Sequence, residues 1–264
     1  MSLIQSTFAR LKEKGEKALI PFVTAGDPDL GQLPAILQTL QEAGADLVEV
    51  GIPFSDPIAD GPTIQAASQR ALDRGVTPPA VLEAIQKAAL EIPVIAMGYL
   101  NPMVRRGLDA FAQDAKEAGV SGIIVCDLTP DPESEPWNHA AQKAGLDTIY
   151  LAAPTSTDHR LNKVALASTG FIYAVSRTGV TGAGTQAPPE VRGLVEKLRS
   201  FSDKPICVGF GISKPDHVKM VCEVADGAVV GSSLVDLLHL AWDSGKGRSL
   251  ILEKIRALKE STFS

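Results

Sequence analysis

Short apolar runs rich in Val and Ile alternate with longer amphipathic stretches along the whole chain. The runs are continuously apolar, which is typical of parallel strands that are buried on both faces. Between them, residues 33–44, 108–119 and 137–145 repeat apolar positions at helical spacing and end on a glycine, where a helix C-cap favours positive φ. We therefore expect eight strands, at 18–25, 45–50, 92–98, 122–126, 147–152, 170–175, 204–209 and 226–231.

Eight strands that alternate with helices predict an α/β fold, and we favour an eight-stranded parallel β/α (TIM) barrel over an open doubly wound sheet. No linker or change of composition divides the chain, so we expect a single barrel domain over 1–264. The first residues predict an extra N-terminal helix with Leu3, Ile4, Phe8 and Leu11 on one face. This helix lacks the apolar core of a secretory signal, which favours a cytoplasmic protein.

Composition narrows the class of protein without identifying it. The chain has 264 residues, of which 45% are hydrophobic and 21% charged, the balance of a soluble globular protein with no run long enough to span a bilayer. A net charge of −6 and the lack of a basic tract argue against binding to nucleic acid. Cys126, Cys207 and Cys222 form no CxxC pair, so reduced thiols are favoured over disulfides or zinc ligands.

Three carboxylates stand in the stretch EVGIPFSDPIADGP at 49–62. Strand alternation places Glu49 on the same face as the apolar Leu47, and a carboxylate that loses hydration there has a raised pKa and can donate or accept a proton. The alternative is a hydrated glutamate at the strand rim. Asp60 ends a loop whose three prolines restrict the backbone enough to aim it. Asp56 fits simple turn chemistry.

Glycine-rich turns follow the last three predicted strands, at Thr181-Gly182, at Gly209–Gly211 and at Gly231-Ser232-Ser233. Each can turn backbone N–H groups toward one point, and the two serines precede a helical run whose N-terminus favours an anion. In a β/α barrel these turns are the recurrent place for a phosphate. The alternative for any one of them is that glycine serves only tight turn geometry.

The types of residue that are missing from the strand ends reduce the number of possible reaction types. No lysine lies at the outgoing end of a strand, which argues against a Schiff base, and the four histidines fall on helical stretches rather than where a metal site would need them. The remaining chemistry is proton transfer on a phosphorylated small molecule by carboxylates. Candidate pocket walls, which could equally be barrel core, are Phe22, Phe54, Ile64, Leu100, Tyr173 and Phe210.

Six motifs, in this order and at these spacings, resemble the tryptophan synthase α subunit over nearly the whole chain. They are PFVTAGDP (21–28), EVGIPFSDPIADGPTIQ (49–65), GYLNP (98–102), APTS (153–156), YAVSRTGVTG (173–182) and GFGIS (209–213). The resemblance implies a retro-aldol lyase that cleaves indole-3-glycerol phosphate to indole and glyceraldehyde 3-phosphate. It implies no metal or cofactor on this chain, and a PLP-bearing β subunit as its partner in an α2β2 complex.

The resemblance also implies residue roles. Glu49 would shuttle protons, and Asp60 would accept a hydrogen bond from the indole N–H. The loop 176–188 would be a mobile lid in which Thr181 approaches Asp60. The implied substrate pocket contains Phe22, Leu100, Tyr173, Thr181 and Phe210, and the implied phosphate site contains Gly182, Gly211, Gly231 and Ser232 or Ser233.

Two departures from the family pattern accompany the resemblance. Thr129 stands where a proline is usual, in a region that contacts the partner in the family, and GSS at 231–233 replaces a more frequent GSA. The alternatives to the leading interpretation are a mainly regulatory α-type subunit, a stand-alone lyase with the same chemistry, and a barrel isomerase that acts on another phosphosugar.

Overall fold

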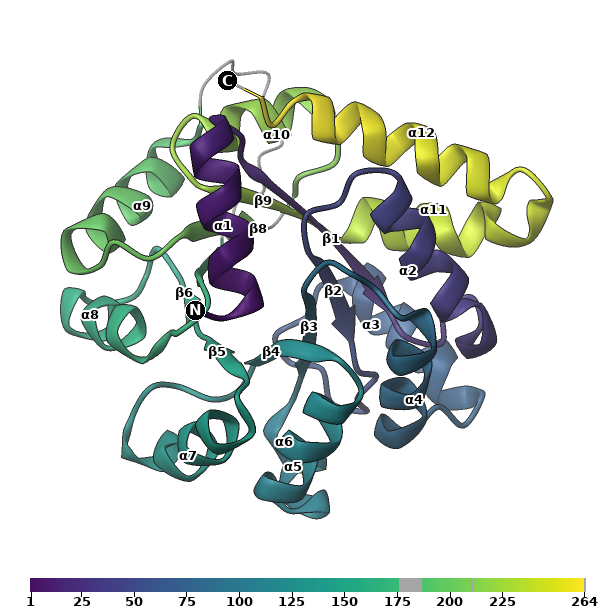
Figure 1. Cartoon of the computed structure of the whole chain (residues 1–264), viewed down its shortest axis with the longest axis horizontal. Helices are drawn as coiled ribbons and strands as arrows, with labels where there is room; N and C mark the ends of the chain where they lie inside the picture. Colours follow the sequence, from purple (N-terminus) through teal and green to yellow (C-terminus); the bar gives the residue numbers. More distant parts are fainter. Residues whose placement is uncertain (176–186, 210, 264) are drawn as a thin grey trace.

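The strands of the protein form one parallel sheet that curls into a barrel (Figure 1). The structure, a computed structural model, describes residues 1–175, 187–209 and 211–263. Within these residues the order of the nine strands across the sheet is β5-β4-β3-β2-β1-β9-β8-β7-β6. They are β1 (Ala18–Thr24), β2 (Val48–Gly51), β3 (Val94–Gly98), β4 (Val120–Val125), β5 (Asp147–Ile149), β6 (Leu151–Ala152), β7 (Ile172–Val175), β8 (Ile206–Gly209) and β9 (Gly227–Val230).

The barrel closes through a single residue, Tyr150, which divides the predicted strand 147–152 into β5 and β6. The first piece pairs with β4 and the second with β7. At the junction the Tyr150 N–H donates to Ser168 Oγ at 3.2 Å, and the Tyr173 N–H donates to the Tyr150 carbonyl at 3.1 Å. The prediction of an eight-stranded barrel is confirmed, with its fifth strand in two pieces because each piece has a different neighbour.

Helices surround the barrel, and the predicted helical patterns are confirmed. Gly44, Gly119 and Gly145 adopt positive φ at or next to the ends of their helices, as expected. The α-helices of the described residues are α1 (Leu3–Lys14), α2 (Leu33–Glu42), α3 (Pro62–Asp73), α4 (Pro78–Ala88), α5 (Leu100–Arg106), α6 (Leu108–Glu117), α7 (Glu135–Ala144), α8 (Asp158–Ala167), α9 (Pro189–Phe201), α10 (Pro215–Cys222), α11 (Ser232–Ala241) and α12 (Gly247–Glu260). Among the described residues, no helix combines the length and apolarity that crossing a membrane requires.

The extra N-terminal helix α1 lies across one end of the barrel (Figure 1). Ile4, Phe8 and Leu11 are buried as predicted, and the Phe8 ring lies 5.9 Å from that of Phe171. The prediction for Leu3 is wrong, because this side chain is 49% exposed and Thr7 completes the buried face instead. The apolar face of α1 therefore joins the core inside the barrel.

Strand alternation divides the apolar side chains into two cores. On β2, Leu47 before the strand belongs to the core inside the barrel, whereas Val48 and Val50 pack in the layer between strands and helices. Glu49 lies in register between Phe22 of β1 and Ile95 of β3. The predicted alternation is confirmed, and it directs the Glu49 carboxylate into the barrel near the carboxyl ends of the strands.

Candidate active site

A cavity of about 600 Å³ opens at the carboxyl ends of the barrel strands. Phe22 of β1, Met97 of β3 and Tyr173 of β7 contribute apolar walls. Asp60 reaches the cavity from the loop after β2, and Gly231 with Ser232 reaches it from the turn after β9. The cavity thus brings together groups from turns that lie far apart in the sequence, at the end of the barrel where the sequence predicted the site.

Glu49 is buried on β2 directly beside Phe22, which lines the cavity, and does not itself belong to the described lining. The residue is 1% exposed, and neither carboxylate oxygen has a hydrogen-bond partner among the described residues. Burial, and then the negative charge of Asp60, raises the pKa of Glu49 from 4.5 to about 8. The structure supports the dehydrated glutamate over a hydrated one at the rim. Such a carboxyl group is largely protonated at neutral pH, so it can give a proton first and accept one afterwards.

Asp60 is held by a tyrosine that the sequence alone did not indicate. The Tyr99 hydroxyl donates to Asp60 Oδ2 at 3.1 Å and accepts from the Ala59 N–H at 3.0 Å. The Phe54 ring stacks on the Tyr99 ring with centroids 4.9 Å apart. Burial raises the pKa of Asp60, while the hydrogen bond from Tyr99 lowers it. Tyr99 therefore fixes one carboxylate oxygen of Asp60.

The loop that carries Asp60 is closed by its own backbone. The Asp60 N–H donates to the Pro57 carbonyl at 3.0 Å, and Gln65 Nε2 donates to the Asp60 carbonyl at 2.8 Å. Proline at 62 then begins α3, as its fixed φ favours at the first helical position. Asp56 is exposed on the same loop, in keeping with turn chemistry. Asp60 is thus partly buried in the cavity lining, whereas Asp56 is exposed to solvent.

The predicted phosphate residues converge only in part within the described chain. Gly211, with φ of +73°, lines the cavity together with Gly231 and Ser232. Ser232 is exposed at the first position of α11, where the helix dipole favours an anion. The Ser233 hydroxyl is buried without a hydrogen-bond partner among the described residues, and Ser233 is not in the cavity lining. Of the two serines, Ser232 is the one in the described cavity lining.

Two further groups of predicted residues have different outcomes. Thr181, Gly182 and Phe210 lie outside the described residues, as does the segment 176–186 of the predicted lid loop 176–188. Phe22, Tyr173 and Ile64 line the cavity as expected. Tyr173 is packed against Gly209, since a Cβ at that glycine would overlap the tyrosine hydroxyl. Any other residue at position 209 would collide with the Tyr173 side chain in this arrangement.

Leu100 is not in the described cavity lining, whereas Met97 of β3, which was not predicted, is. The reason is that β3 ends at Gly98 and Leu100 begins α5, so strand alternation no longer directs it inward. Its N–H donates to Asp127 Oδ1 at 2.9 Å, and its side chain packs on the layer outside the barrel. Met97, two residues after Ile95 on the inner face, could have been found from the alternation of β3.

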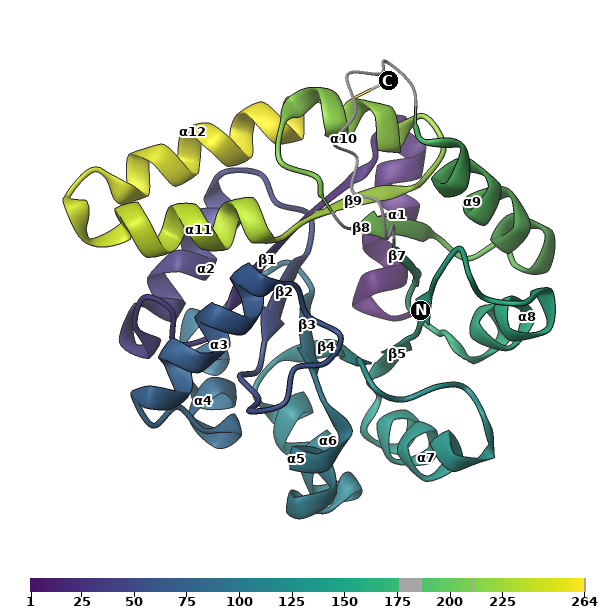
Figure 2. The same cartoon turned by 180° about the vertical axis from the view of Figure 1, so that it is seen from behind.

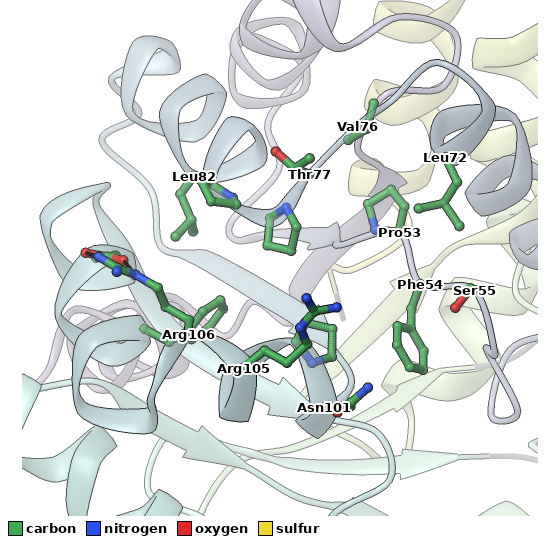
Figure 3. Close-up of a pocket in the computed structure, with 15 residues that line it drawn as sticks. Pro53, Phe54, Ser55, Leu72, Val76, Thr77, Leu82, Asn101, Arg105 and Arg106 are labelled. Atoms are coloured by element: carbon green, nitrogen blue, oxygen red, sulfur yellow. Dashed lines mark hydrogen bonds and ion pairs between the residues drawn. The ribbon is translucent and has the colours of Figure 1, made fainter.

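A second cavity of about 640 Å³ lies outside the barrel, between the loop at 53–55 and helices α4 to α6 (Figure 3). Its described lining includes Phe54 and the cationic Arg105 but neither Glu49 nor Asp60. Among the described residues, no group of three or more His, Cys, Asp and Glu side chains could hold a metal ion. Of the two cavities, it is the one at the barrel end that contains Asp60, with Glu49 beside its Phe22 wall.

Comparisons with known proteins agree with this geometry. A family model described as "Tryptophan synthase alpha chain" matches residues 8–262. The tryptophan synthase alpha chain of Geobacter sulfurreducens is 45% identical over 263 residues, which cover 99% of each chain. That of Geotalea uraniireducens is 50% identical over 241 residues, covering 90% of each chain. The crystal structure of tryptophan synthase subunit alpha from Legionella pneumophila superposes with a TM-score of 0.91 at 36% identity, covering 99% of this chain and 98% of that one.

Proposed function

The chain belongs to the tryptophan synthase alpha chain family, and we propose that it cleaves indole-3-glycerol phosphate to indole and glyceraldehyde 3-phosphate by a retro-aldol reaction. One observation carries the proposal: beside Phe22 of the cavity wall stands a glutamate that is buried, unpaired among the described residues and largely protonated near neutral pH. A proton donor of this kind is what the departure of an indole ring requires.

The reaction uses one proton donor and one proton acceptor, and Glu49 serves as both. The neutral carboxyl group gives its proton to C3 of the indole ring, which leaves positive charge on the ring. The bond between C3 and the glycerol chain then breaks, and its electron pair restores the aromatic ring. The hydroxyl on the departing carbon loses its proton to the Glu49 carboxylate as the aldehyde forms. Glu49 ends the cycle protonated, as it began.

Asp60 stabilises the charge that the first step creates. With Oδ2 held by Tyr99, its Oδ1 accepts a hydrogen bond from the indole N–H. The positive charge on the protonated ring grows toward the transition state, so the attraction of the carboxylate is stronger there than in the bound substrate. Phe22, Met97 and Tyr173 supply apolar contact to the ring.

The phosphate is bound at the other side of the cavity. Gly211 and Gly231 offer backbone close to the cavity, and Ser232 adds a hydroxyl at the N-terminus of α11. We also assign Gly182, Phe210 and Thr181 to the substrate site by similarity. Because an anion bound at a helix terminus is fixed in position, this contact orients the chain that joins the phosphate to the ring.

Three further assignments follow from the family. The alpha chain family implies a β-subunit partner, and we propose a PLP-bearing β subunit that receives the indole in an α2β2 complex. We assign the reaction to the cytoplasm. We also treat 1–264 as one β/α barrel domain, because β1 pairs directly with β9 near the other end of the chain.

The test is indole formation from indole-3-glycerol phosphate, measured for the isolated chain and again with β subunit. We expect Glu49→Gln to lower kcat by at least about 100-fold, the usual contribution of a general acid–base group. Asp56→Asn, an exposed acid of the neighbouring loop, is the matched control and should keep the activity of the isolated chain.

The alternatives predict other outcomes. A stand-alone lyase would show no change of rate when β subunit is added. A mainly regulatory subunit would keep its activation of the partner and show the same slow indole release with or without the Glu49 substitution. A chain that leaves indole-3-glycerol phosphate intact in every mixture would contradict the proposed function.

A further inference from the structure

A buried carboxylate at the carboxyl end of β1, Asp27, joins two helices that both begin at the active-site cavity. Its side chain is fully buried. From α3, Arg70 Nε and Nη2 donate to its two oxygens at 3.0 and 2.6 Å, and Arg74 Nη1 lies 3.9 Å from Oδ1. From α11, His239 Nδ1 lies 3.1 Å from Oδ1. Neither the predicted roles nor the proposed mechanism uses this cluster.

The contacts of Asp27 are specific in direction. The two parallel hydrogen bonds from Arg70 form a planar, bidentate pair, which fixes angle as well as distance. A fully buried carboxylate that lost its partners would leave an uncompensated charge, so the arrangement resists small displacements of either helix. Asp27 therefore holds α3 and α11 in one relative position.

Both helices carry cavity-lining residues on the face that Asp27 holds. The helices lie side by side (Figure 2). Thr63, near the start of α3, lines the cavity and stands seven residues before Arg70; Ser232, at the start of α11, lines it and stands seven residues before His239. Seven residues are about two turns, so each pair shares a helix face about 10 Å apart along the axis.

We propose that Asp27 is a positioning residue that sets the distance between the two ends of the substrate site. The inference rests on the proposed function, which places the indole at Asp60, just before α3, and the phosphate at Ser232, on α11. A ligand whose two ends are joined by a short chain gains the full benefit of both subsites only if their separation lies within the span of that chain. Separate fragments, each bound at one subsite, are insensitive to that separation.

The experiment compares linked and separate ligands on the full chain carrying Asp27→Asn. The probes are indole, inorganic phosphate, and an analogue in which a saturated three-carbon chain joins indole C3 to phosphate. Calorimetry should give dissociation constants for the two fragments within about twofold of the wild type, and a loss of at least about tenfold for the linked analogue. The kcat/KM for the substrate should fall by a similar factor.

The matched control is Asp46→Asn. Asp46 is also a buried carboxylate, which accepts from Lys259 Nζ at 2.9 Å and from the Leu19 N–H at 2.8 Å, but it precedes β2 at the opposite end of the barrel. It should lower the melting temperature and leave the affinity for the linked analogue unchanged. An equal loss of that affinity in Asp46→Asn would overturn the proposal, because the effect would then be one of general stability.

A second variant, His239→Ala, tests the proposal if Asp27→Asn does not fold. His239→Ala removes the α11 contact alone, at a side chain that is 37% exposed, and should weaken the linked analogue by at least about threefold with the fragments unchanged. Unchanged affinity for the linked analogue in a folded variant, or an equal loss for fragments and analogue, contradicts the positioning role. If the wild type neither binds the analogue nor cleaves the substrate, the proposed function is wrong instead.

Discussion

Replacing Glu49 by glutamine should stabilise the folded protein at neutral and alkaline pH while it abolishes proton transfer. The carboxyl group has an ordinary pKa of 4.5 and a folded pKa of about 8. Below pH 4.5 both states are protonated, and the contribution of the neutral group to stability is complete. As the pH rises to about 8, the unfolded chain ionises before the folded one, and that contribution is progressively lost. The loss is about 1.4 kcal/mol per pH unit, or about 5 kcal/mol in all.

Glutamine keeps the shape of the neutral carboxyl group and does not titrate, so the variant escapes this loss. The assay is urea denaturation of both proteins from pH 4.5 to 9, with the difference in unfolding free energy plotted against pH. That difference should be small at pH 4.5, grow to about 5 kcal/mol near pH 8 and then stay constant.

The control is Glu83→Gln on the surface of α4, where the carboxylate pairs with Lys87 and is 64% exposed. Its difference from the wild type should stay flat from pH 5 to 9, because the hydrogen bond from Lys87, and then its positive charge, lower the pKa of Glu83 rather than raising it. A flat profile for Glu49→Gln as well would refute the dehydrated glutamate and, with it, the acid step derived above.

Three other outcomes are expected. The kcat/KM should fall as the pH rises through about 8, since protonated Glu49 begins the reaction; a pH–rate profile that is level to pH 9.5 would contradict this. Tyr99→Phe should lower kcat/KM by about tenfold, the worth of a hydrogen bond to a charged group, with an unchanged circular dichroism spectrum; full activity would show that Asp60 needs no such support. Met97→Ala should raise KM severalfold by removing about 1 kcal/mol of apolar contact, whereas Leu100→Ala should leave KM within about twofold; the reverse pattern in steady-state kinetics would restore Leu100 to the pocket.

The barrel could be predicted because each buried strand is a short apolar run with clear ends. Local pattern did not locate all of those ends: β4 begins at Val120 rather than at residue 122, and β2 begins at Val48 rather than at residue 45. The division at Tyr150 was not predictable, since it depends on which strand lies beside each half of 147–152. Pairing partners are a property of the closed barrel, not of the local sequence.

The two acids could be predicted for a different reason. Glu49 interrupts an apolar strand face, and Asp60 ends a loop stiffened by proline, so both stand out locally. Tyr99 does not, because its role depends on a contact with a residue 39 positions earlier. The contacts of Asp27 likewise could not be predicted from the sequence, because they depend on α3 and α11 lying side by side in the fold. Leu100 was expected at the pocket wall from its place just after the third strand and from the family resemblance; it begins α5 and is not in the described cavity lining, which depends on how that helix is placed.

The first helix and the first strand of the chain make native contacts with segments that are synthesised much later. Ile4 lies against Gly122 and Gly170, and β1 completes its pairing with β9 at Gly227–Val230. A ribosome that adds about 5–20 residues per second makes β9 roughly 10–40 s after β1. During that interval one edge of β1 has no native partner, and the apolar face of α1 lacks its neighbours until Gly122 and Gly170 have been made. The first strand of the barrel can therefore complete its pairing only after nearly the whole chain has been synthesised.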